Sequence, residues 1–127
     1  MKQNLLLIIT SLLSILFTTF HLAGDIVLGF ENGGIVNLAV MPILVVWLYG
    51  TLVLAGRRSG YVIMLLGSLL GLLVPVLHMT GRGLGEIAQS SGAFFFIWTT
   101  IALGVTALTS LVLSVRGLWT LPRTTSD

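Results

Sequence analysis

The two histidines of the chain, His21 and His78, are accompanied by acidic side chains in a pattern suited to metal binding or proton transfer. His21 and Asp25 are four positions apart, so on a helix they lie on the same face. Two further acids, Glu31 and Glu86, each follow a histidine within ten residues. Imidazole and carboxylate groups are common zinc and iron ligands, and histidine also exchanges protons near neutral pH. Chemistry would therefore be located among these five residues.

The remainder of the chain is strongly apolar, with 56% hydrophobic and only 8% charged residues. Soluble domains carry about a quarter charged residues, and a short chain cannot bury so much apolar surface in its own core. We therefore expect the lipid bilayer to be its solvent. No basic run interleaved with aromatic residues occurs, so a nucleic-acid partner is not expected. The absence of cysteine excludes disulfides, thiolate metal sites, iron–sulfur clusters and covalent c-type haem.

Four apolar stretches are each long enough, at about 20 residues, to cross a bilayer as a helix. They run over residues 5–25, 37–56, 59–80 and 93–115. Each must be helical, because lipid offers no partner for free backbone amides. The predicted fold class is therefore an all-α integral membrane protein. A single domain, residues 1–127, would form a four-transmembrane-helix bundle with up-down-up-down topology.

Basic residues predict the orientation of the chain, because they favour the cytoplasmic side of a membrane. In a four-span chain, Arg82 falls on one side and all the others fall on the opposite side: Lys2, Arg57, Arg58, Arg116 and Arg123. We therefore expect both termini inside, the cytoplasmic (inner) membrane as location, and the loops of Glu31 and Glu86 outside. The alternative for the first span is a signal peptide cleaved after Ala23, which would remove His21 from the mature chain.

The first and third spans resemble each other at an offset of 57 residues. At this offset His21 aligns with His78, Asp25 aligns with Arg82, and both spans carry a stripe of small residues. At about 1.5 Å per residue, both histidines lie roughly 24–26 Å from the cytoplasmic boundary. We therefore expect His21 level with His78, and Asp25 level with Arg82 one turn further out.

The sequence leaves four interpretations of these residues open, and the primary one is structural. Asp25 and Arg82 would form an ion pair between helices, and the protein would be an accessory subunit that binds other membrane subunits or a second copy. In the second interpretation, His21 and His78 are the axial ligands of a b-type haem and Arg82 pairs with a propionate. Side chains at a depth suited to packing on that haem are Phe17, Phe20, Met79 and Trp98.

The other two interpretations use the carboxylates directly. In the third, His21, Asp25 and His78, with a loop glutamate, bind a divalent metal such as zinc or iron. In the fourth, the histidines and acids relay protons. No nucleophile elbow, complete phosphate loop or Ser/His/Asp set occurs, so catalysis is not expected. The choice depends on which side chains the fold brings together.

Overall fold

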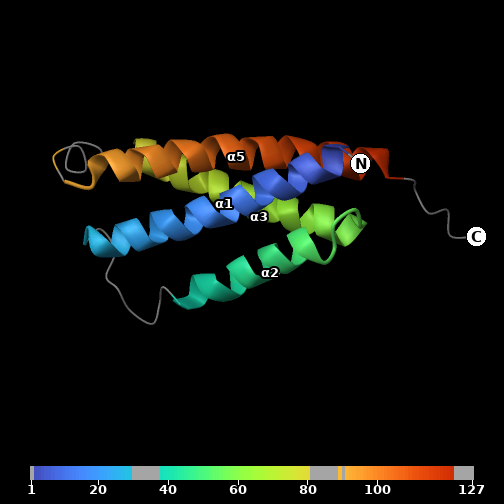
Figure 1. Cartoon of the computed structure of the whole chain (residues 1–127), viewed down its shortest axis with the longest axis horizontal. Helices are drawn as coiled ribbons and strands as arrows, with labels where there is room; N and C mark the ends of the chain where they lie inside the picture. The colour runs from blue at the N-terminus through green and yellow to red at the C-terminus, as the bar shows by residue number, and fades with distance from the viewer. Residues whose placement is uncertain (1, 30–37, 81–88, 90, 122–127) are drawn as a thin grey trace, which may run out of the picture.

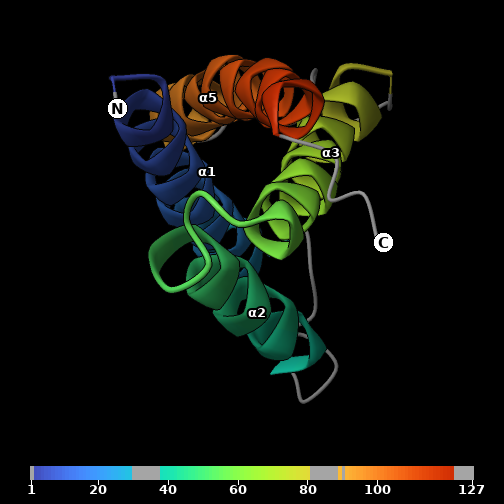
Figure 2. The same cartoon turned by 90° about the vertical axis from the view of Figure 1, so that its right-hand side faces the viewer.

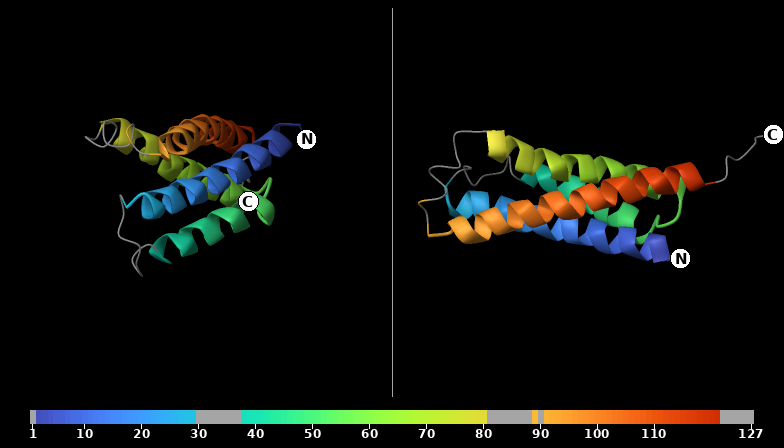
Figure 3. Two further views of the ribbon diagram at one scale, coloured as in Figure 1. Left: turned by 60° about the vertical axis from the view of Figure 1, so that its left-hand side comes forward. Right: turned by 90° about the horizontal axis from the view of Figure 1, so that it is seen from above.

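The computed structural model describes residues 2–29, 38–80, 89 and 91–121, and this part of the chain consists of helices joined by turns, without strands. Its four helices are α1 (Lys2–Val27), α2 (Val40–Leu52), α3 (Arg58–Thr80) and α5 (Ala93–Thr120). Figure 1 shows them lying alongside one another. Viewed from one end, α5 and α2 lie on opposite sides, with α1 and α3 between them (Figure 2). The views of Figure 3 agree with this arrangement.

Three of the four helices, α1, α3 and α5, are long and apolar enough to cross a membrane. Their outward faces carry large apolar side chains that water would not favour, such as Leu16 on α1, Leu66 on α3 and Val105 on α5. Lipid-facing helices present such surfaces, because hydrocarbon is as apolar as the side chains themselves. The expectation of an all-helical membrane protein is confirmed to this extent.

The second helix is shorter than the predicted span over residues 37–56. Helix α2 has 13 residues, or about 20 Å at 1.5 Å per residue, whereas a bilayer core is about 30 Å thick. It ends at Leu52 because the chain turns before α3, and Gly56 adopts a positive φ of 79° in that turn. A side chain at this position would be strained. Residues 30–37, where the predicted span begins, lie outside the described part of the chain.

The interior of the bundle is built largely from small and hydroxyl-bearing side chains. Fully buried positions include Ser11 and Ser14 on α1, Ser68 on α3 and Ser110 on α5. Small residues let helix backbones approach closely, and the resulting van der Waals contacts contribute to packing between helices in lipid. A cluster of larger apolar side chains adds to this interior at one place: Leu7, Leu44, Trp47, Tyr61 and Met64.

A closed set of hydrogen bonds fastens α2 to α1. The Trp47 indole Nε1 donates to Ser11 Oγ at 2.9 Å, and Ser11 Oγ lies 2.7 Å from Thr51 Oγ1. Because the Thr51 hydroxyl donates to the Trp47 carbonyl at 2.9 Å, Ser11 is the donor to Thr51. All three side chains are buried, so every polar group in the set has a partner away from water.

The offset of 57 residues is also the contact register of α1 and α3. Tyr61 donates to Asn4 Oδ1 at 2.6 Å near the beginnings of the two helices, and His21 contacts His78 near their ends. The two helices therefore run in the same direction at the same level. Helix α5 runs the opposite way along α3, since Gly117 lies against the ring of Tyr61 and Phe96 lies against His78.

Candidate functional site

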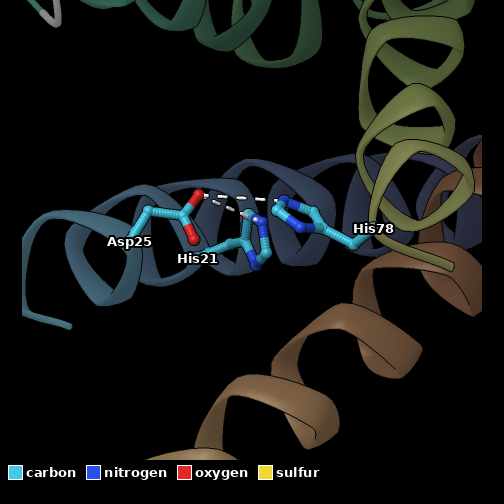
Figure 4. Close-up of side chains that lie close together, drawn as sticks. All are labelled: His21, Asp25 and His78. Atoms are coloured by element: carbon cyan, nitrogen blue, oxygen red, sulfur yellow. Dashed lines mark ion pairs between the residues drawn. The ribbon is translucent and has the colours of Figure 1, made fainter. Parts of the chain in front are cut away.

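Three ionisable side chains converge near the ends of α1 and α3 (Figure 4). On α1, His21 Nε2 lies 3.3 Å from Asp25 Oδ2. From α3, His78 Nε2 lies 3.9 Å from the same carboxylate oxygen. One potential ligand atom from each residue lies within 4.8 Å of the others. The structure thus places two imidazoles around one carboxylate.

Helix geometry and burial explain how the residues are positioned. His21 and Asp25 occupy successive turns of one face of α1, and both residues are almost fully buried, at 4% and 6% exposed. The side chain of His78 keeps 30% of its surface exposed, so the cluster is closed on the α1 side and partly open on the α3 side. Pro75, one turn before His78, is buried inside α3.

Helix α5 completes the cluster with an aromatic wall. The ring of Phe96, 2% exposed, lies 4.7 Å from the ring of His21 and 5.2 Å from the ring of His78. The two imidazoles themselves contact edge to face, with centroids 4.7 Å apart. Such packing restricts the rotation of both histidines and excludes water from this side of the cluster.

Thr100 on α5 sets the tautomer of His21. Its Oγ1 lies 3.3 Å from His21 Nδ1, and its single hydroxyl proton is donated to the carbonyl of Phe96 at 2.8 Å. The hydroxyl oxygen therefore accepts from His21, which places a proton on Nδ1. In the neutral imidazole, Nε2 then carries the lone pair and faces the Asp25 carboxylate.

The buried Nε2 of His21 makes no hydrogen bond within the described residues. Asp25 Oδ2 lies near it, but without the alignment of a hydrogen bond. Two acceptor atoms held 3.3 Å apart are stabilised by a cation that both contact, either a proton or a metal ion. The geometry of the cluster thus suits cation binding.

The site residues predicted from the sequence are only partly brought together. His21, Asp25 and His78 meet, and the two histidines are level as expected. Arg82, Glu31 and Glu86 lie outside the described residues. The predicted ion pair between Asp25 and Arg82 therefore also lies outside the described part of the chain, because it needs Arg82. The side chain of Met79 is likewise not described.

A b-type haem does not fit between the two histidines as they are arranged. Two axial imidazoles lie on opposite faces of a porphyrin, each about 2 Å from the iron, which separates their ring centres by roughly 6 Å. The observed centroids are 4.7 Å apart and the rings touch directly. Two of the aromatic residues expected to pack on the macrocycle, Phe20 and Trp98, have 41% and 56% of their surface exposed.

Comparison with known proteins gives no family from which a function can be carried over. No protein-family model, curated protein or solved structure matched the chain. The function is therefore argued from the geometry of the cluster.

Two residues that shape the site, Phe96 and Thr100, are not evident in the sequence as functional. Phe96 reads as part of an interfacial aromatic belt, and Thr100 as one of many hydroxyl residues in an apolar span. The only sequence feature that could have pointed to them is their depth in the membrane. Because α5 runs opposite to α1 and α3, its first turns lie level with the last turns of both. Which face of α5 would turn inward could not be read from that depth.

Proposed function

We propose that this chain is a small integral membrane protein that binds a divalent transition-metal ion through His21, Asp25 and His78. The observation that carries the proposal is the convergence of three ligand atoms within 4.8 Å, from residues of two helices. A tetrahedral ion with bonds of about 2.0–2.1 Å separates its ligand atoms by roughly 3.3 Å. The His21–Asp25 pair already has this spacing, at 3.3 Å.

His78 is the ligand that must move to complete the site. Its Nε2 is 3.9 Å from Asp25 Oδ2, and the three ligand atoms lie within 4.8 Å of one another, so separations must shorten by about 0.6 to 1.5 Å to reach tetrahedral spacing. Its side chain is the most exposed of the three, so the approach would start from the open side of the cluster, against the ring contacts with His21 and Phe96. The pair on α1 is the preformed part of the site, and α3 supplies the adjustable ligand.

Two imidazoles and one carboxylate suit zinc or iron(II) better than calcium or magnesium, which prefer sets of oxygen ligands. Three protein ligands leave at least one coordination position for water or another molecule. The tautomer of His21 supports the proposal, because the hydrogen bond to Thr100 directs the Nε2 lone pair to the ion.

The direct test is titration of the purified protein in lipid nanodiscs with Co²⁺, a coloured substitute for zinc. We expect one ion per chain and visible d–d bands typical of a low-coordinate site with nitrogen ligands. Elemental analysis of protein prepared without chelator should show bound zinc or iron. A folded protein that binds no divalent metal would refute the proposal, and a Soret band would favour haem instead.

Replacing Thr100 with valine is expected to weaken Co²⁺ binding by about 10- to 100-fold, the usual effect of losing a hydrogen bond that orients a ligand. Valine keeps the shape but removes the acceptor of the His21 Nδ1 proton. Thr106→Val is the matched control, because the Thr106 hydroxyl bonds only carbonyls of its own helix. Equal affinities of the two variants would contradict the assigned tautomer.

The membrane topology remains a proposal: four passes, up-down-up-down, in the cytoplasmic membrane, with both termini inside. The basic residues at the end of the bundle opposite the cluster support this orientation, since Arg58 begins α3 and Arg116 lies near the end of α5. A tag placed after Asp127 should react with impermeant reagents only after the cells are opened. Labelling in intact cells would contradict the orientation.

The role of accessory subunit, beside other membrane subunits or a second copy, also stays a proposal. The exposed apolar faces of α1, α3 and α5 suit either lipid or neighbouring helices. Extraction in mild detergent should then recover the chain with larger partners. A stable, isolated monomer in the same detergent would count against this role and leave the metal site untouched.

A further inference from the structure

Two imidazoles and one carboxylate form a ligand set that two kinds of metal centre share. Zinc takes four ligands, three from the protein and one from solvent or substrate. Iron(II) bound by two histidines and one carboxylate keeps several further positions open on one face of the ion. The number of additional ligands that can reach the ion therefore decides which metal suits His21, Asp25 and His78.

Helix α1 closes one side of the cluster. His21 and Asp25, which both belong to this helix, are only 4% and 6% exposed. Because both residues are almost fully buried, water does not reach an ion between them from the α1 side.

The ring of Phe96 closes the side that faces α5. Figure 4 shows α5 passing beside the three side chains of the cluster. From this helix, Phe96 contacts both imidazoles, with ring centroids 4.7 Å from His21 and 5.2 Å from His78. The same ring also reaches α1, because a Cβ atom at Gly24 would lie 3.9 Å from Phe96 Cδ2. The ring thus fills the space beside the ligands with carbon atoms, which do not coordinate an ion.

Two grooves flank α5 at this level, and Phe96 lines both of them. The groove between α3 and α5 also has His78 in its wall, but its surface exposes no polar atom. The nitrogen atoms of His78 are therefore not exposed in this groove. The groove between α1 and α5 is lined mainly by apolar side chains, such as those of Phe20 and Val27. Apolar cavities stay dry, so neither groove brings solvent ligands to the ion.

The remaining opening lies at His78, whose side chain keeps 30% of its surface exposed. An opening on one side of the ion admits a water molecule or one other small ligand, which brings the coordination number to four. Zinc, with its filled d shell, has no preference for a higher number. Iron(II) and manganese(II) favour octahedral surroundings, so the missing positions lower their affinity.

We infer that Phe96 limits the bound ion to four ligands and thereby makes the site selective for zinc over iron(II). Phe96 is not itself a ligand, because it acts by occupying the positions that water would otherwise take. This inference rests on the proposed metal site and names the ion that the site holds.

The first test compares the wild type with Phe96→Ala in nanodiscs, with Co²⁺ as the probe of coordination number. Four-coordinate Co²⁺ has intense d–d bands because its surroundings lack a centre of inversion, whereas six-coordinate Co²⁺ absorbs weakly. The wild type should show intense bands. In Phe96→Ala, water enters beside the imidazoles, and the bands should weaken by about tenfold. Weak bands in the wild type, or equally intense bands in both proteins, would overturn the inference.

Competition of Zn²⁺ and Fe²⁺ against bound Co²⁺, in the absence of oxygen, measures the selectivity itself. Zinc binds most nitrogen and oxygen sites more tightly than iron(II), so the relevant quantity is how the ratio of the two affinities changes. Removing the ring should lower the ratio of zinc to iron(II) affinity by at least about tenfold in Phe96→Ala. An unchanged ratio would contradict the role of Phe96 in selectivity.

Phe95→Ala is the matched control, because it removes the same side chain from the adjacent position of α5. The ring of Phe95 is half exposed and packs on Phe20, with centroids 6.1 Å apart. This variant should keep the Co²⁺ bands and the affinity ratio of the wild type. The same loss in Phe95→Ala would overturn the inference, because contact of the ring with the histidines would then not be the cause.

A second variant, Phe96→Leu, covers the case in which alanine at this buried position unfolds the bundle, as judged by circular dichroism. Leucine keeps most of the apolar volume but lacks the flat ring against the two imidazoles. The Co²⁺ bands should weaken in the same direction as for alanine, by a smaller factor. A folded Phe96→Leu protein with bands as intense as those of the wild type would overturn the inference.

Failure of this inference is distinct from failure of the metal site. Co²⁺ that binds the wild type with weak bands leaves the metal site standing and refutes the limit of four ligands. A folded protein that binds no Co²⁺ refutes the metal site, and with it the selectivity.

Discussion

Alanine in place of His21 or His78 is expected to weaken Co²⁺ binding by more than about 100-fold. Loss of a residue that merely orients a ligand costs about 10- to 100-fold, and removal of the ligand itself should cost more. Each histidine supplies one of the three atoms that lie within 4.8 Å. Affinity is measured by titration of the d–d bands in nanodiscs, with circular dichroism as the check that the helices remain folded.

Trp98→Ala is the matched control for these variants. Trp98 lies on α5 near the level of the cluster, but more than half of its surface is exposed. Its loss removes a larger aromatic group than histidine and should leave the Co²⁺ affinity unchanged. If the histidine variants bound Co²⁺ as tightly as the control, the metal site would be refuted. That result would favour the structural interpretation, in which the polar residues only pair with one another.

Alanine at Gly67 is expected to destabilise the bundle, whereas alanine at Gly104 is not. A Cβ atom at Gly67 would overlap the indole ring of Trp47, which is buried and fastened to Ser11 by its hydrogen bond. Overpacking of this kind costs about 1–3 kcal/mol. At Gly104 the added Cβ only makes ordinary contact with Pro75, so the variant gains helix propensity, about 1 kcal/mol, without a clash.

The comparison of the two variants isolates the packing effect, because both exchange the same residue types within a helix. We expect Gly67→Ala to lower the free energy of unfolding by about 1–3 kcal/mol relative to Gly104→Ala. Unfolding in mixed micelles of sodium dodecyl sulfate and a mild detergent, followed by circular dichroism, measures this difference. Equal stabilities would mean that α2 does not pack on Gly67 as the structure has it.

Much of the fold could be predicted from the sequence because its determinants are local. Apolar stretches of about 20 residues in lipid must be helical, whatever their neighbours. The constant rise of a helix also predicts that His21 and His78 lie at one level, and the structure brings their rings into contact. The spacing of His21 and Asp25 likewise predicts that both lie on one face of α1.

The boundary of α2 could not be predicted in the same way. Residues 53–55 are as apolar as the helix before them, so composition alone extends the span to Gly56. The structure ends the helix at Leu52, and Gly60 at the start of α3 lies tightly against the carbonyl of Leu54. That close approach depends on how α3 returns along α2, which is a tertiary property.

The sequence by itself determined the all-helical class, the three helices long and apolar enough to cross a membrane (α1, α3 and α5), and the level at which chemistry could occur. It could do so because hydropathy and helical periodicity act within each segment. Only the tertiary structure decided which interpretation of the polar residues the geometry favours. The rotation of each helix about its own axis decides which side chains meet, and packing between helices sets that rotation. This rotation brings His78 to Asp25, closes the cluster with Phe96, and places Thr100 where it directs a lone pair of His21 inward.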